Sequence, residues 1–464
     1  MENTIQAQQK VSHPALMMVS LLLGAFVGMF SETALNIALP QLMIVFHTNT
    51  STIQWLVTGY MLVIGIVLPL ASLISKWFTT RQVIIFALID FIVGALISAT
   101  AQNFTFLLAG RMIQGIATGL ILPLMFAIVM QIFPAPKIGT AMGFCALVIM
   151  FAPAIGPTIT GFVLAELSWR WIFWLFIPFL LIGLLFAFYS LENIGEVTKP
   201  HVDVLSIIES IFGCSGLVIS ASLASSMRWF SFPVIFPLLI GFIALGFYVH
   251  RQLHLKVPIL NLRIFQIPTF TIGTLLVMLD FAIILSTMYL LPMFYQRGLL
   301  ISVALTGIVM LPGGLVNAIT SAFAGRIYDN VGVKLPAILG FTIALIGTLM
   351  LAFTTPHSSI VYVMLAHIVL MIGCPLALSP SQTSALSSLS GKESGDGSTI
   401  MNTMQQMIGA LSTALTTNFL AWGSSAQVGS SALRFTNGFH YGIYFAILLI
   451  IIALLLSLRL QKES

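Results

Sequence analysis

The chain consists of apolar runs, each about 20 residues long, with short polar breaks between them. Only 7% of its 464 residues are charged, whereas 59% are hydrophobic. A soluble fold needs far more charge to cover its surface, so a water-soluble globular domain is excluded. Runs of this length span the hydrocarbon core of a bilayer as α-helices, and they lack the alternation of barrel strands. The sequence therefore predicts an all-α polytopic membrane protein embedded in a lipid bilayer.

Fourteen of these runs are long enough to cross a membrane. They lie at residues 15–39, 53–74, 83–101, 104–132, 139–164, 171–190, 204–226, 232–250, 269–294, 302–323, 336–354, 360–380, 399–421 and 438–458. The longest hydrophilic breaks are at 191–202 and 384–398, and neither is long enough for a separate soluble domain. The second break is rich in Ser and Gly, which predicts a flexible loop.

The basic residues between the runs predict which side each loop faces, because Lys and Arg collect on the cytoplasmic side. With the N-terminus placed inside, thirteen Lys and Arg residues fall in inside segments and four in outside segments. This bias predicts two cytoplasmic termini in a multi-pass protein of the cell membrane. The net charge of +5 is therefore a topology signal and does not indicate a nucleic-acid partner.

Two short segments of similar position predict an internal repeat. Residues 71–81 follow the second run and residues 324–334 follow the tenth, the later one with the spacing Gly-x-x-x-Asp-x-x-Gly-x-Lys. They imply two halves of six helices, with two extra helices inserted between them. The predicted organisation is a cytoplasmic N-terminus at 1–14, an N-terminal half at 15–190, an inserted pair with its flanking loop at 191–250, a C-terminal half at 251–458 and a cytoplasmic tail at 459–464.

Glu32 is the one ionisable residue in the first run, 15–39. A carboxylate at membrane depth costs roughly 2.5–3.5 kcal/mol, so it normally faces a bundle interior or a watery cavity. Gly24, Gly28 and Asn36 recur with Glu32 at every fourth residue and share one helix face, which suits close packing beside a polar path. Glu32 is thus a candidate proton or cation site. The alternative is a buried, hydrogen-bonded Glu without a transport role.

Arg111 is the one basic residue that lies within a run, about seven residues into the fourth. Gln114, Gly115 and Gly119 follow it on the same helix face. A guanidinium at that depth needs a partner or water, and Glu32 is a candidate, directly or through water. Such a pair could couple protonation to a conformational change. The alternative is a static ion pair that sets helix packing.

The fifth run contains an unusual set of helix-disrupting residues, Pro153, Gly156, Pro157 and Gly161. Each proline removes a backbone donor and kinks a helix, whereas glycines allow close approach of a neighbour. A kinked, closely packed helix suits the interface between two halves that rock against each other. The alternative is an ordinary irregular membrane helix.

Two further carboxyl groups lie within runs. Asp280 is near the middle of the ninth run, whose helix is the counterpart of the Glu32 helix in the second half. It is a candidate for a second proton site or a contact to a cationic substrate, and the alternative is a structural Asp. Asp90, in the third run, is a weaker candidate for the same role. His367 is interpreted as a buried core residue, and no Cys, His, Asp or Glu group has metal-site spacing.

Four motifs together resemble the major facilitator superfamily, in its fourteen-span drug/proton antiporter branch. They are the Glu32-Thr33-Ala34-Leu35-Asn36-Ile37-Ala38-Leu39-Pro40 stretch, the repeated 71–81 and 324–334 segments, the 110–119 stretch and the 152–161 stretch, which is similar to the branch's antiporter motif. Within the branch, residues 79–81 and 151–161 are most similar to lincomycin-type multidrug exporters. The resemblance implies a role in coupling for Glu32 and Arg111, and an antiport role for the fifth helix.

The sequence departs from the family pattern at two places. The branch usually has Asp at the position of Glu32, whose carboxyl group is one methylene further from the backbone. In the first copy of the repeated segment, Lys76 stands where the family has an acidic residue. We therefore predict that the second copy forms the cytoplasmic loop latch, with Gly325, Asp329, Gly332 and Lys334.

The resemblance implies a proton-coupled exporter of small amphipathic or drug-like molecules that works by alternating access. It would use the proton gradient and no cofactor, and the sequence lacks the Gly-x-x-x-x-Gly-Lys-Ser/Thr loop of ATP-driven proteins. Three alternatives stay open: a same-fold exporter of a physiological lipid, metabolite or signalling nucleotide, a non-transporting sensor, and a membrane enzyme. The oligomeric state also stays open, and a monomer is compatible with the sequence.

Overall fold

The protein is a bundle of long helices. A computed structural model describes residues 13–460 apart from 134, 195–196, 198–202, 225–226, 256–257 and 390, and within this range it contains fourteen α-helices and two short helical turns. All regular elements of the described chain are helical, which confirms the predicted all-α fold. The predicted terminal segments 1–14 and 459–464 lie largely outside the described residues.

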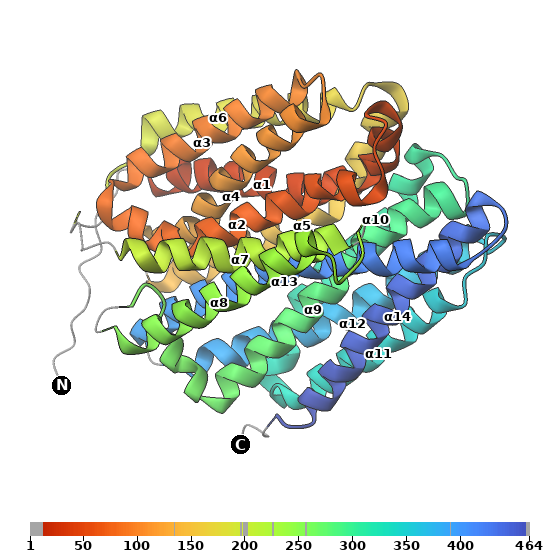
Figure 1. Ribbon diagram of the computed structural model, residues 1–464. Coiled ribbons are helices and arrows are strands. Elements are labelled where there is room, and N and C mark those ends of the chain that lie inside the picture. The colour runs from red at the N-terminus through yellow and green to blue at the C-terminus, as the bar shows by residue number, and fades with distance from the viewer. Residues whose placement is uncertain are drawn as a thin grey trace.

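The first six helices form one group, the upper part of Figure 1. They are α1 (Pro14–Val45), α2 (Thr50–Trp77), α3 (Thr80–Ala99), α4 (Phe104–Ile132), α5 (Ala135–Glu166) and α6 (Arg170–Ser190). Polar caps set several of their starts. The Asn49 and Asn103 side chains accept hydrogen bonds from the first turns of α2 and α4, and Thr79 forms a capping box with Gln82.

The last six helices form the second group, the lower part of Figure 1. They are α9 (Pro268–Met293), α10 (Val303–Val331), α11 (Lys334–Ala352), α12 (Ile360–Ser387), α13 (Gly391–Ala426) and α14 (Ser431–Ser457). The 3-10 turn η1 (Leu262–Gln266) precedes α9 and the π-helical turn η2 (Phe294–Gly298) follows it. Ser302, Ser359 and Ser430 cap the starts of α10, α12 and α14.

The two groups repeat one packing pattern. In the first group α1 packs against α4, α5 and α6, and in the second α9 packs against α12, α13 and α14. The pairs α2–α4, α3–α4 and α3–α6 likewise correspond to α10–α12, α11–α12 and α11–α14. Between the groups, α5 packs on α10 and α2 packs on α13, which are equivalent contacts. This pattern supports the predicted internal repeat, while the exact domain boundaries stay a prediction.

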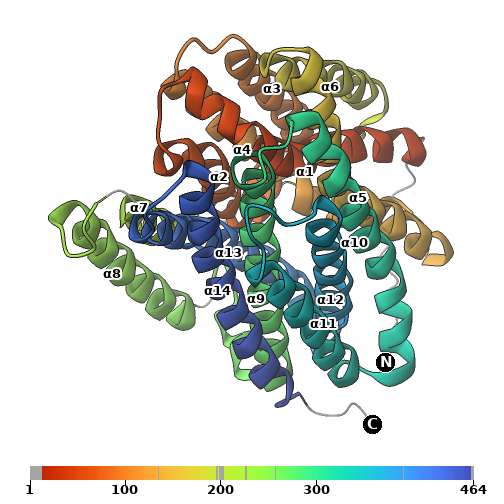
Figure 2. The same ribbon diagram turned by 90° about the vertical axis from the view of Figure 1, so that its right-hand side faces the viewer.

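The inserted helices α7 (Val204–Ala224) and α8 (Phe232–His254) form a hairpin beside the bundle. α7 also packs against α2 and α13, one helix from each group. α8 lies at the outer edge in Figure 2. Its Phe232, Phe242 and Phe247 side chains are more than half exposed, as expected for a surface that faces lipid.

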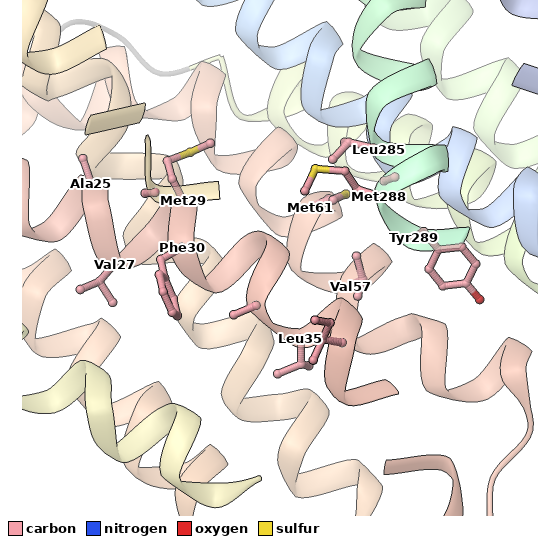
Figure 3. Close-up of a cluster of buried hydrophobic side chains, with 14 of the residues drawn as sticks. Ala25, Val27, Met29, Phe30, Leu35, Val57, Met61, Leu285, Met288 and Tyr289 are labelled. Atoms are coloured by element: carbon pink, nitrogen blue, oxygen red, sulfur yellow. The ribbon is translucent and has the colours of Figure 1, made fainter. Parts of the chain in front are cut away.

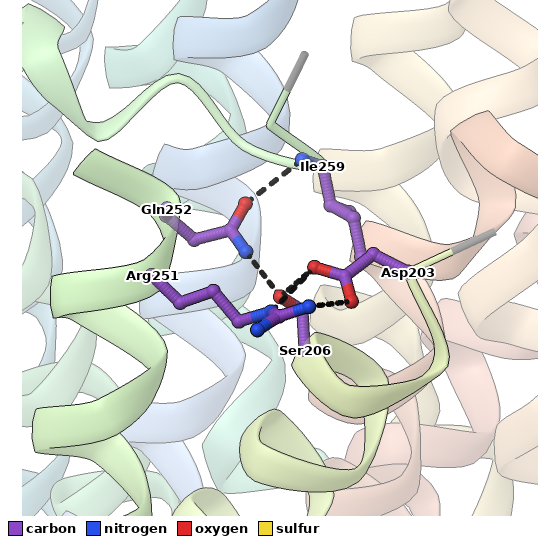
Figure 4. Close-up of polar contacts among 5 residues, drawn as sticks. All are labelled: Asp203, Ser206, Arg251, Gln252 and Ile259. Carbon is purple, nitrogen blue, oxygen red and sulfur yellow. Dashed lines mark hydrogen bonds and ion pairs between the residues drawn. The ribbon is translucent and has the colours of Figure 1, made fainter. Parts of the chain in front are cut away.

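A polar network joins the open end of this hairpin to the chain that enters the second group (Figure 4). Arg251 of α8 donates two hydrogen bonds to Asp203, at 2.8 and 2.7 Å, and thereby lowers the pKa of the Asp203 carboxyl to about 2. Gln252 donates to Ser206 of α7 at 2.7 Å and accepts from the backbone N–H of Ile259 at 2.8 Å. The network ties α7, α8 and the segment before α9 together.

Several helices extend beyond the apolar runs from which they were predicted. The expected flexible loop at 384–398 is wrong: α12 continues to Ser387 and α13 begins at Gly391. Glu393 in the first turn of α13 suits the helix dipole, and Gly397 lies closely against Leu389 and Phe270. Packing therefore holds a Ser- and Gly-rich stretch in a helix that its composition disfavours.

Twelve of the described helices are long and apolar enough to cross a membrane by themselves. α5, part of which is not described at side-chain level, and α13 do not belong to this set. α13 has 36 residues, and polar side chains such as Gln405, Thr413 and Asn418 are buried along it. It packs against α2, α9 and α14, so protein rather than lipid surrounds its polar residues.

Candidate functional site

Glu32 lies on the face of α1 that packs against α4. A Cβ atom on Gly24 would meet Ile121 of α4, and one on Gly28 would meet Thr118, so both glycines allow close approach of the two helices. Glu32 follows on the same face, one turn further along. Its side chain is 2% exposed, and its Oε2 atom has no hydrogen-bond partner among the described residues.

Arg111 of α4 is fully buried and held by neutral acceptors. Its Nε donates to the carbonyl oxygen of Leu56 at 3.1 Å, and its Nη2 donates to the carbonyl oxygen of Ser31 at 3.1 Å. Its Nη1 donates to the Ser31 hydroxyl and to Gln114 Oε1, the latter at 3.0 Å. These contacts come from α1, α2 and α4, and together they fix the guanidinium in one place.

Of the two arrangements left open for Glu32 and Arg111, a direct ion pair or a contact through water, the described residues do not form the direct ion pair. Within the described part of the chain, one ion pair has its charged atoms within 4.0 Å, and it joins Arg251 to Asp203. Arg111 bonds instead to Ser31, the neighbour of Glu32, and the two charges act on each other over a longer distance. The carboxyl group of Glu32 is therefore close to a positive charge without being tied to it.

Tyr60 of α2 completes the surroundings of Arg111. The guanidinium carbon lies 4.0 Å from the centroid of the Tyr60 ring. Gly115 of α4 lies against the Tyr60 backbone, and Gly119 lies against Val67, so the predicted glycine face packs on α2. Neither Tyr60 nor Ser31 was predicted from the sequence. The sequence feature that could have indicated Tyr60 is its position, a polar aromatic residue in the interior of the apolar run 53–74.

The prolines of α5 create a specific contact with α1. Pro157 has no N–H, so the carbonyl oxygen of Pro153 lacks its partner within the helix. The Thr33 hydroxyl donates to that oxygen at 3.1 Å. A Cβ atom on Gly156 would meet Thr33, so the glycine allows this approach. The residue beside Glu32 thus anchors α5.

Gly161 brings the same helix onto the second group. A Cβ atom there would lie 3.0 Å from the Cα atom of Gly307 on α10. The Thr158 hydroxyl donates to the Gly307 carbonyl oxygen at 2.9 Å. A further bond between the groups runs from Gln296 of η2 to the carbonyl oxygen of Ile37 on α1, at 2.9 Å. α5 therefore packs against the second group, while its role in antiport stays a prediction.

Asp280 of α9 is fully buried, and neither of its carboxyl oxygens has a hydrogen-bond partner among the described residues. The Cys374 thiol of α12 lies beside it. Asp90 of α3 is half-buried next to Ala117 of α4. Ala117 lies six residues after Arg111 in the same helix. The three predicted carboxyl groups therefore lie on different helices and have different neighbours: Arg111 for Glu32, Cys374 for Asp280 and Ala117 for Asp90.

The predicted loop latch is only partly described. Gly332 has φ +70° and ends α10, which suits a residue without a side chain, and the Lys334 ammonium donates to the carbonyl oxygen of Leu458 at 2.9 Å. A Cβ atom on Gly325 would meet open space, and the Asp329 side chain lies outside the described residues. At the first copy, Lys76 of α2 attracts Asp396 of α13 electrostatically, without forming an ion pair.

Apolar side chains fill the region between the two groups. Figure 3 shows Leu35 of α1, Met61 of α2 and Met288 of α9 within one buried cluster. Met407 of α13 lies against Gly65 of α2. Methionine adapts its shape to different neighbours, so this region can repack around molecules of varied shape. No group of three metal-ligating side chains occurs among the residues that the structure describes.

Two similar helix groups that pack on each other, with buried charges inside an apolar bundle, define a membrane-embedded transporter. The family model of the Major Facilitator Superfamily matches residues 21–414, and the chain belongs to that superfamily. It is therefore a multi-pass transporter of small molecules in the cell membrane, and not an enzyme.

Curated relatives cover the whole chain. It is 43% identical to the lincomycin resistance protein LmrB of Bacillus subtilis (strain 168), over 98% of this chain and 97% of the relative. LmrB of Listeria monocytogenes serovar 1/2a is 41% identical over the full length of both chains. The multidrug export protein EmrB of Haemophilus influenzae is 24% identical over 87% and 79% of the two chains. These relatives confirm the resemblance identified from the sequence motifs.

Solved structures show the same fold. The crystal structure of a peptide transporter POT in complex with sulfate superposes with a TM-score of 0.70. The superposition covers 96% of this chain and 94% of that chain, at 15% sequence identity. The arrangement of helices is therefore shared by transporters whose sequences differ widely.

Proposed function

We propose that this transporter is a proton-coupled antiporter that exports small amphipathic or drug-like molecules by alternating access. The observation that carries the proposal is the buried Glu32 carboxyl near the fixed, positively charged Arg111. Protonation of Glu32 removes its attraction for Arg111 or for a cationic substrate. That loss changes the balance between two conformations of the helix groups, which is the requirement for coupling.

The equivalent contacts between the groups support alternating access. α2 packs on α13 and α5 packs on α10, so a rocking motion can act on both pairs in the same way. The close approach of Gly161 and Gly307 gives α5 and α10 a contact about which they can turn. Glu32 and Asp280 are at most 2% exposed, so water reaches either carboxyl only after the helices have moved.

The apolar region between the groups supports the proposed substrate class. Met61, Met288 and Met407 are flexible side chains from helices of both groups, and flexible apolar linings accept varied molecules. The full-length relatives are named for resistance to lincomycin, and a more distant one for multidrug export. Lincomycin is thus the first substrate to test, followed by the lipophilic cation tetraphenylphosphonium.

Transport into inverted membrane vesicles tests the proposal. Vesicles from cells that lack their own exporters would contain wild type, Glu32→Gln or Glu32→Asp, energised by respiration. We expect wild type to accumulate lincomycin and a protonophore to abolish the accumulation. Glu32→Asp keeps the carboxyl group and serves as the matched control for the neutral Glu32→Gln.

Accumulation that persists after the proton gradient has collapsed would contradict proton coupling. If neither lincomycin nor tetraphenylphosphonium accumulates in wild type, the drug-export part of the proposal is wrong. A screen of lipids, metabolites and signalling nucleotides with the same vesicles would then identify a physiological substrate.

A further inference from the structure

Among the described residues, the hydrogen-bond acceptors of Arg111 are all neutral. Leu56, Ser31 and Gln114 supply neutral oxygen atoms, and four hydrogen bonds use the Nε, Nη1 and Nη2 atoms. Hydrogen bonds in the guanidinium plane resist displacement within that plane most strongly. A contact on the face of the guanidinium adds resistance to tilting out of the plane.

Tyr60 supplies the contact on that face. Its ring centroid lies 4.0 Å from the guanidinium carbon of Arg111, and both side chains are fully buried. Attraction between a cation and an aromatic face is strongest where water is excluded. The ring thus covers the guanidinium and compensates part of a charge that forms no direct ion pair within the described chain.

The Tyr60 ring is itself fixed at its far end. Its hydroxyl bonds to the carbonyl oxygen of Gly28 on α1 at 2.8 Å and to the Thr118 hydroxyl of α4 at 2.7 Å. Gly28 and Thr118 are in close contact, so the gap between α1 and α4 cannot widen without breaking these bonds. Tyr60 therefore spans three helices that meet next to Glu32.

We propose that Tyr60 is a positioning residue for proton coupling, whose ring keeps the Arg111 charge at a fixed distance from Glu32. The inference rests on the proposed antiport. Tyr60 itself exchanges no proton in this scheme: Glu32 takes up one proton from water and returns it to water. Because the guanidinium is held still, Glu32 experiences the same positive charge in each cycle.

Among the described residues, the ionisable side chains that interact with Glu32 are Arg111 from α4 and Tyr60 from α2. Asp280 is on α9, which also packs on α1. A change in the proton affinity of Glu32 that Tyr60→Leu causes and Tyr60→Phe does not cause therefore reports on the placement of Arg111.

The test compares Tyr60→Leu, which removes the ring, with Tyr60→Phe, which keeps the ring and removes the hydroxyl. Purified protein in detergent would receive lincomycin, or tetraphenylphosphonium if lincomycin is not transported, and a pH indicator would record proton release between pH 5 and 9. Thermal unfolding and substrate affinity are measured on the same samples. If Tyr60→Leu does not fold, Tyr60→Met fills more of the space and replaces it.

For Tyr60→Leu we expect the pH midpoint of release to rise by about one unit, which is tenfold in proton concentration. The physical reason is that Arg111 relaxes away and Glu32 loses a favourable charge. Tyr60→Phe should keep the wild-type midpoint within about 0.3 units, because the ring suffices.

Two results would overturn the assignment. One is a folded, substrate-binding Tyr60→Leu or Tyr60→Met protein with the wild-type midpoint, which would leave Tyr60 with a structural role only. The other is a Tyr60→Phe protein whose midpoint moves as far as that of Tyr60→Leu, which would exclude the ring as the cause. Absence of proton release from wild type is a different outcome, because it contradicts the proposed antiport itself.

Discussion

The two helix groups contain one buried carboxyl group each on equivalent helices, and their surroundings differ. Glu32 of α1 lies near Arg111, whose position is fixed by bonds to three helices. Among the described residues, Asp280 of α9 has the Cys374 thiol beside it and no cation that acts on it. An uncompensated carboxylate is costly in a dry interior, so we expect the two carboxyl groups to contribute unequally to coupling. The difference teaches that a repeated fold can place equivalent carboxyl groups in unlike surroundings.

The largest expected effect is the difference in proton release and transport between a Glu32 variant and an Asp280 variant. Glu32→Gln should abolish lincomycin-driven proton release and lower transport by about 5- to 150-fold, the range of ordinary coupling energies. Asp280 has no cation acting on it among the described residues, so Asp280→Asn should lower transport by less than about threefold, or under 1 kcal/mol. Vesicle transport and indicator measurements on both variants check this. Equal losses would show that the two sites are functionally equivalent.

The second prediction tests the fixed charge. Arg111→Lys keeps the charge but loses the forked donors and the flat face, and should destabilise the protein by about 2 kcal/mol. In a chain of this size that corresponds to a fall in Tm of about 2 °C, measured by intrinsic fluorescence in detergent.

Arg297→Lys is the matched control for this substitution. Arg297 is half-buried over the Phe435 ring of α14, with 4.9 Å from the guanidinium carbon to the ring centroid. Its replacement should change the Tm by less than half as much. A larger change at Arg297 than at Arg111 would contradict the importance of the Arg111 contacts.

The third prediction concerns the bond that compensates for the missing N–H of Pro157. Thr33→Val keeps the shape and leaves the Pro153 carbonyl oxygen without a donor, at a cost of about 1–2 kcal/mol. The Thr342 hydroxyl of α11 bonds only within its own helix and is exposed, so Thr342→Val provides the control. We expect the Tm to fall for the Thr33 variant alone, and equal shifts would rule out a special role for this bond.

The smallest expected effect is at the open end of the α7–α8 hairpin. Asp203→Asn removes the ion pair between Arg251 and the Asp203 carboxylate. The Arg251 side chain is 36% exposed, and exposed ion pairs contribute little to stability. The Tm should therefore fall by about 1 °C or less at pH 7. The folded pKa of Asp203, about 2, lies below the ordinary 3.8. Its stabilisation is therefore present above pH 3.8 and is lost as the pH falls through 2.

Unfolding curves of wild type and Asp203→Asn at pH 3 to 7 check this prediction. The difference between the two proteins should be constant near neutral pH and shrink toward acid. A difference that grows as the pH falls would have the wrong sign and would contradict the assigned bond.

Much of the fold was predictable because each membrane helix must satisfy its own backbone, so its apolar run is visible in the sequence. The helix ends were less predictable: α10 continues through Tyr328 to Val331, and α13 begins at Gly391, in stretches that are polar or rich in Gly. There, packing against neighbouring helices outweighs composition.

The candidate site was predictable in part. Glu32 and Arg111 were recognisable because charges are rare in apolar runs. Their actual partners were not, since Ser31 and Tyr60 are ordinary residues whose importance arises only when α1, α2 and α4 meet. Whether Glu32 and Arg111 meet directly or through water could not be predicted for the same reason: sequence spacing places a residue on a helix face but does not give its distance to another helix.

The α7–α8 hairpin has a consequence for the order in which the protein is made. Its two helices are in close contact through Gly216 and Gly241, so the hairpin can assemble as soon as both helices have left the ribosome. Its anchor in the second group, the hydrogen bond from Asn418 to the Ala221 carbonyl oxygen, spans 197 residues of sequence. During synthesis the paired hairpin can therefore form in the bilayer before its contact with α13, which is translated near the end of the chain.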